Sequence, residues 1–182
     1  RRRRRASGTS WPSPGPTRRT RRATGVLYLI MMGSTFSSLG VVLPHMIRTL
    51  HMNFAEAGVG FTALALAAAS ASMLPSVTIR RWNGRVTIAF GVLAMILAYL
   101  VLAICPDAFV YDIGAALLGL GFGLIGAVPA LHILGGLEVE RRALVFGTYL
   151  AFGGLGGALW PTAVEGSVAA FGGWRAYWWA MV

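Results

Sequence analysis

Charged residues divide most of the chain into uncharged stretches of nearly constant length. Five such runs, of 25, 23, 21, 25 and 22 residues, lie between charged side chains, at 23–47, 57–79, 86–106, 113–137 and 143–164. A membrane-spanning helix needs about 20 predominantly apolar residues. The runs show neither the polar face of a helix packed in a soluble core nor the two-residue alternation of a membrane β-barrel. A sixth run starts after Arg175. We therefore expect an all-α membrane protein, a polytopic helical bundle of five complete transmembrane helices and the start of a sixth.

The composition supports a membrane protein. The chain is 56% hydrophobic and only 12% charged, whereas soluble domains are usually about 25% charged. A single cysteine excludes a disulfide framework and a metal site built from several cysteines. We expect no cofactor and no metal.

Residues 1–25 differ from the rest, because they hold nine of the sixteen arginines and three prolines. Such a segment cannot bury apolar surface, so we expect a disordered cytoplasmic tail followed by a membrane domain over 26–182. The alternative is translated sequence upstream of the true start. Nucleic acid is not an expected partner, because no aromatic side chains alternate with the arginines. The chain starts at an arginine and stops inside an apolar run, so we expect a fragment that lacks a C-terminal half.

Arginine placement predicts the orientation in the membrane. With the N-terminus in the cytoplasm, fourteen of the sixteen arginines lie inside, and only Arg48 and Arg175 lie outside, as the positive-inside rule requires. We therefore expect a multi-pass protein of the cell (inner) membrane. Tyr177, Trp178 and Trp179 stand where the sixth run begins and suggest an interfacial aromatic belt.

Small residues and prolines recur inside the runs. Gly119 and Gly123, and likewise Gly153 and Gly157, are four residues apart, a spacing that lets helices approach closely. Static packing and helices that rock against each other are both open interpretations. Pro75 and Pro161 are each the nineteenth residue of their run, the second and the fifth. This match suggests an inverted repeat of three plus three spans, with coincidence as the alternative.

Three short motifs resemble the N-terminal six-helix half of the major facilitator superfamily. The loop Val77-Thr78-Ile79-Arg80-Arg81-Trp82-Asn83-Gly84-Arg85-Val86 is similar to the family pattern G-x-x-x-D-R-x-G-R-[RK], with Val77 and Arg81 in place of its leading glycine and acid. Glu140-Arg141-Arg142-Ala143-Leu144, with Gly147, Gly156 and Pro161 after it, resembles the fifth span. Gly173-Trp174-Arg175 resembles the start of the sixth.

The resemblance implies secondary active or facilitative transport of a small solute by alternating access, with an organic anion or carboxylate as the candidate. The partners would be a small-molecule substrate, the lipid bilayer and the missing C-terminal half of the same chain. The inner-gate loop would comprise Arg81, Gly84 and Arg85. Helix packing or rocking would involve Gly119, Gly123, Gly147, Gly153, Gly156, Gly157 and Pro161.

Polar side chains inside the runs are the candidates for a substrate cavity. Ser34, Thr35 and Ser38 share part of one helix face in the first run; bonds to their own helix backbone are the alternative. Tyr149 in the fifth run is a similar candidate. The five runs contain no acid, so His132, and less plausibly His45, would titrate near membrane depth. A histidine satisfied by hydrogen bonds is the alternative for His132.

Two other classes of protein remain as rivals. We do not expect an enzyme, because the acids stand at the ends of runs and neither an HExxH motif nor a serine nucleophile turn occurs. The second rival is a multi-pass membrane protein with an assembly or structural role and no transport.

Overall fold

A computed structural model describes residues 18–82, 84–126 and 139–182, and all regular structure within them is helical. The first span comprises α1 (Arg18–Met32), the π-helical turn η1 (Gly33–Ser37) and α2 (Ser38–Leu50). The second comprises α3 (Phe54–Ala71) and α4 (Leu74–Arg81). The others are α5 (Gly84–Ile104), α6 (Ala108–Ile125), α8 (Val139–Phe171) and α9 (Trp174–Ala180).

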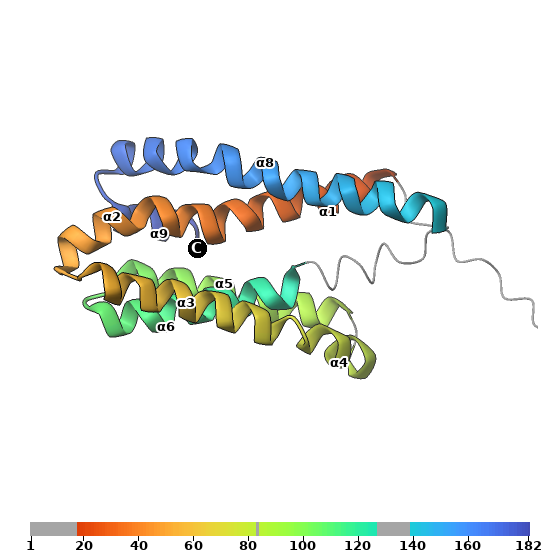
Figure 1. Ribbon diagram of the computed structural model, residues 1–182, viewed down its shortest axis with the longest axis horizontal. Helices are drawn as coiled ribbons and strands as arrows, with labels where there is room; N and C mark the ends of the chain where they lie inside the picture. Colours follow the sequence, from red (N-terminus) through yellow and green to blue (C-terminus); the bar gives the residue numbers. More distant parts are fainter. Residues whose placement is uncertain (1–17, 83, 127–138) are drawn as a thin grey trace, which may run out of the picture.

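Five helices in the described part of the chain are long and apolar enough to cross a membrane, which confirms the predicted count. The chain turns at alternate ends of the bundle (Figure 1). One end, here named the Arg81 end, holds the start of α1, the α4–α5 turn and the start of α8. The opposite end, the Cys105 end, holds the α2–α3, α5–α6 and α8–α9 turns.

The helix ends at the Cys105 end have local causes. The Asn53 side chain accepts a hydrogen bond from the Glu56 N–H (2.8 Å), and the Asn53 N–H donates to the Glu56 carboxylate (2.9 Å). This capping box starts α3. Asp107 caps α6 by accepting from the Val110 N–H (2.9 Å).

The expectation that the spans contain no acid is wrong. Glu56, Asp112 and Glu165 lie inside α3, α6 and α8, within the segments that qualify as spans. Each acid lies within two turns of a helix end: Glu56 and Asp112 are the third and fifth residues of α3 and α6, and Glu165 is six residues before the end of α8. The 33 residues of α8 extend about 50 Å, well beyond the roughly 30 Å hydrocarbon core. A helix can therefore carry an acid near its end without placing it at membrane depth.

The predicted boundary at residue 26 also falls too late for the helix. α1 begins at Arg18, about two turns earlier, because arginine is a good helix former and the helix can continue past the bilayer. The expectation of disorder for residues 1–17 lies outside the described residues.

Three of the packed helix pairs match those that an inverted repeat predicts, whereas the close α5–α6 pair has no counterpart of similar extent between α9 and the first span. α1 packs along α8, α3 packs along α6, and α5 contacts α9. In an inverted repeat, spans one, two and three correspond to spans four, five and six. The contact of spans one and five (α1 with α8) then corresponds to that of spans four and two (α6 with α3). The contact of spans three and six (α5 with α9) corresponds to itself. In Figure 1, α1, α2, α8 and α9 form one layer, and α3, α4, α5 and α6 form the other.

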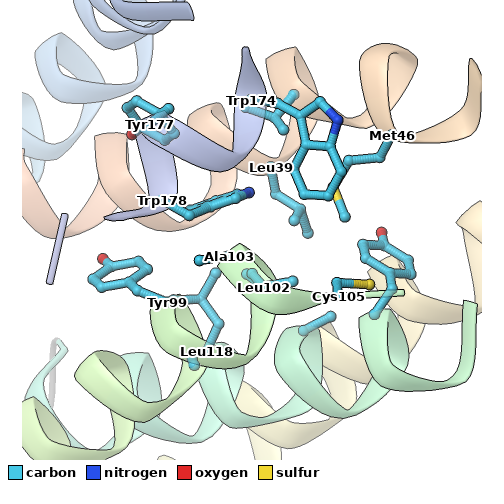
Figure 2. Packing of buried hydrophobic residues seen from close by; sticks show 14 of the residues in the cluster. Leu39, Met46, Tyr99, Leu102, Ala103, Cys105, Leu118, Trp174, Tyr177 and Trp178 are labelled. Carbon is cyan, nitrogen blue, oxygen red and sulfur yellow. The ribbon is translucent and has the colours of Figure 1, made fainter. Parts of the chain in front are cut away.

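The main core lies between these layers, where α9 faces α5. Trp178 and Tyr177 are 0% and 4% exposed, and the Trp178 ring stacks on Tyr99 with centroids 5.8 Å apart. Figure 2 shows Trp178 between Leu39 on one side and Tyr99 on the other. The predicted interfacial belt is therefore wrong for these two residues. Only Trp179 is exposed, because each turn of α9 presents one side to α5.

Candidate functional site

The first span changes from α-helical to π-helical geometry over Gly33–Ser37. The turn ends at Ser38, whose backbone N–H donates to the Gly33 and Thr35 carbonyls. Gly33 lies against the Trp160 indole of α8, and a Cβ at this position would overlap the ring. The glycine thus permits the contact that seats the turn on α8. Single π-turns inside helices occur frequently at functional sites.

A chain of hydrogen bonds crosses from this turn to α8 and α9. The Ser38 hydroxyl donates to the Gly33 carbonyl (3.0 Å) and lies 2.5 Å from the Tyr177 hydroxyl. The Trp160 Nε1–H donates to the same Tyr177 oxygen (3.1 Å). Because the Ser38 proton is already directed at Gly33, the Tyr177 O–H donates to Ser38. One directional chain therefore joins three spans.

A second polar contact follows from Pro161. Proline has no N–H, so the carbonyl of Gly157, four residues earlier in α8, loses its helical donor. The Ser37 hydroxyl donates to that carbonyl at 3.0 Å. The turn η1 thus satisfies a backbone group that the proline leaves free, as membrane helices require.

The three hydroxyl candidates of the first span are fully enclosed in this conformation. Ser34, Thr35 and Ser38 are 1%, 0% and 0% exposed. Ser34 donates to the Met31 carbonyl at 3.4 Å, as the alternative of bonding to its own helix predicts. Ser38 combines such a bond with its contact to Tyr177. The Thr35 Oγ1 atom is buried without a hydrogen-bond partner among the described residues.

The residues joined by these hydrogen bonds are here named the polar cluster: Gly33, Ser37, Ser38, Gly157, Trp160 and Tyr177. The other two cavity candidates do not join the polar cluster. Tyr149 stacks on Tyr28 with centroids 4.2 Å apart, in a separate apolar group with Val145. It precedes Trp160 by eleven residues of α8, or about 16 Å along the helix. His132 lies outside the described residues, so its role stays a prediction.

Most of the predicted packing glycines lie where two helices touch. A Cβ at Gly119 or Gly123 of α6 would overlap the α3 backbone around Leu64 and Ala68. The corresponding contacts of α8 with α1 involve Gly156, which lies against the Leu29 backbone, and Gly153, which lies against the Tyr28 ring.

Gly147 and Gly157 differ from these glycines. No described atom lies within 4 Å of a Cβ built at Gly147, so close packing does not account for that glycine. Gly157 has only the Ser37 hydroxyl at 3.9 Å, and it contributes through its carbonyl.

The residues predicted for a gate loop lie at the Arg81 end. Arg81 ends α4, Gly84 starts α5, and the side chains of Arg81 and Arg85 are exposed. α4 is separated from α3 by a break at Ser72 and Met73, with Pro75 in its first turn. The Thr87 hydroxyl donates to Thr78 (2.9 Å) and ties α5 to α4 beside the loop.

The described residues contain no cluster of three or more histidine, cysteine or acidic side chains that could hold a metal. The geometry defines a polytopic α-helical membrane protein in which three helix pairs match an inverted repeat. The sequence profile of the Major Facilitator Superfamily matches residues 20–182. The chain belongs to this superfamily, which confirms the resemblance and makes it an integral membrane protein of a solute-transporting, non-enzymatic family. Comparisons with curated proteins and with solved structures found no match.

Sequence reasoning missed two members of the polar cluster. Trp160 is not among the predicted site residues, and Tyr177 is predicted only as part of an aromatic belt. The missed signal was the proline of α8, since Pro161 predicts an unpaired carbonyl that a neighbouring helix must satisfy.

Proposed function

We propose that the chain is one half of a transporter that moves a small organic anion across the cell membrane by alternating access. A second six-helix half would complete the pathway. The single observation that carries this proposal is the turn η1, a π-helical turn within the continuous helix of the first span, which hydrogen bonds hold to α8 and α9. Single π-turns inside helices occur frequently at functional sites.

The contacts of this turn also give α8 and α9 a way to move. The contact between the first span and α8 consists largely of glycines and polar bonds, at Gly33, Gly156 and the Ser37–Gly157 pair. Two packings of such a surface can differ by a few broken hydrogen bonds, each with a net free energy of about 1 kcal/mol. In this packing Thr35 is enclosed, and a packing that opened the surroundings of η1 would expose its hydroxyl to a solute.

The orientation with the Arg81 end in the cytoplasm belongs to the same proposal. The charge distribution supports it, since Arg80, Arg81 and Arg85 cluster at the Arg81 end, whereas Arg48 and Arg175 lie at the opposite end.

The test is uptake of radiolabelled succinate by the intact protein in vesicles. Succinate is the chosen probe because its two charges make passive leakage slow. We expect uptake above that of protein-free vesicles, and we expect Ser38→Ala to change the initial rate about fivefold, because a bond of about 1 kcal/mol differs between the two packings.

Ser167→Ala is the matched control, since Ser167 is half-buried and its hydroxyl donates to the Ala163 carbonyl in the same helix. Uptake no faster than in protein-free vesicles would contradict the transport proposal. Equal rates for Ser38→Ala and Ser167→Ala, at equal protein content, would remove the cluster from the mechanism.

A further inference from the structure

A pocket of about 440 Å³ opens at the Cys105 end, away from the polar cluster. It is lined by His45, Arg48 and Thr49 of α2 and by the Gly172–Arg175 turn into α9. Its volume is within the range of pockets that bind small molecules. Two guanidinium groups and one imidazole line it, and no carboxylate is among the lining residues.

The Arg175 guanidinium is held in place before any ligand binds. Its Nη2–H donates to the Cys105 carbonyl at 2.9 Å, and its carbon lies 4.7 Å from the centroid of the Trp174 ring. Trp174 is in turn fixed by the bond from its Nε1–H to Thr49 (3.3 Å). A guanidinium has five N–H donors, and only one of those of Arg175 is used in these contacts.

Arg48 lines the same pocket from α2. It lies in the last turn of α2 with an exposed side chain. Both arginines thus face one pocket without an acid in its lining to neutralise them. Unpaired guanidinium groups are the strongest recognition elements for an oxyanion, which they bind through two parallel hydrogen bonds.

We infer that this pocket is a carboxylate-binding site at which an anionic solute docks before it enters the transport pathway. The inference rests on the proposed function and names its substrate class, a small carboxylate held by Arg48 and Arg175. A lipid headgroup phosphate has the same chemistry, so the experiment must separate the two sources.

The intact protein is placed in phosphatidylcholine nanodiscs and titrated with succinate by calorimetry, with succinamide as the neutral isostere. We expect succinate to bind, succinamide not to bind, and affinity to fall with added salt. Arg48→Gln should raise the succinate Kd about tenfold, because one charge-assisted contact is lost. Arg80→Gln, at the opposite end of the bundle, should leave the Kd unchanged.

Arg48→Gln is the decisive variant, because no hydrogen bond joins the Arg48 side chain to the turn among the described residues, whereas Arg175→Gln would also lose the Cys105 contact. Equal binding of succinamide, or an unchanged Kd in Arg48→Gln, overturns the inference. Loss of succinate binding when phosphatidylglycerol replaces part of the phosphatidylcholine also overturns it, because the pocket then binds lipid headgroups.

The outcome is separable from that of the uptake test. Succinate uptake by the intact protein, together with an unchanged Kd in Arg48→Gln, would reject this site and leave the transport proposal standing. Arg48-dependent binding without uptake would reject transport and leave a carboxylate site on the chain.

Discussion

At Gly156 the absence of a side chain lets α8 approach the backbone of α1. A Cβ there would overlap the Leu29 carbonyl, and a backbone atom cannot rotate away as the end of a long side chain can. We predict that Gly156→Ala lowers the free energy of unfolding by about 1–3 kcal/mol, the usual cost of overpacking. Thermal unfolding in detergent, followed by circular dichroism, measures the change.

Gly154→Ala is the matched control for Gly156→Ala. Gly154 lies two residues away on the exposed side of α8, with no described atom within 4 Å of its Cβ position. Alanine favours a helix over glycine by up to about 1 kcal/mol, so the melting temperature should stay the same or rise. Equal destabilisation by both variants would show that the close approach to α1 does not determine the effect.

Pro161 and Ser37 test the coupling between two elements, α8 and η1. Ser37→Ala should destabilise the chain by about 0.6–1 kcal/mol, because the Gly157 carbonyl loses its donor. In a Pro161→Ala background a backbone N–H becomes available to that carbonyl, so the same Ser37→Ala change should cost less. A double-mutant cycle of unfolding free energies measures this coupling. Additive effects would show that the proline does not create the need for Ser37.

The elements also show what the sequence can predict. The five spans followed from the charged residues, because burial of a charge in hydrocarbon is costly enough to leave a visible pattern. The turn η1 and the α3–α4 break were not predicted, since both depend on contacts with helices far away in sequence, such as Gly33 with Trp160. Of the site candidates, Ser38 joins the polar cluster and Tyr149 does not, because residue type indicates hydrogen-bonding capacity but not the facing helix.

The whole molecule has two chemically different ends, which allows its orientation to be tested with thiol labels. Trp82 and Phe109 are 60% and 72% exposed, at the Arg81 end and the Cys105 end respectively. The native Cys105 should not react with the label. It is fully buried, and the pKa of its thiol is raised, mainly by desolvation. The thiol therefore stays protonated at pH 7, where the thiolate needed for reaction with maleimide is scarce.

We predict that a membrane-impermeant maleimide added to intact cells labels Phe109→Cys and spares Trp82→Cys. In inside-out vesicles the pattern should reverse, because the arginine-rich end is then outside. The unsubstituted chain should remain unlabelled at pH 7 in both preparations, and labelling of both variants after detergent treatment shows that each thiol can react. Labelling of Trp82→Cys on intact cells would show that the orientation is the reverse of the predicted one. It would place the arginine pocket at the cytoplasmic face, where a carboxylate would dock for export and not for uptake.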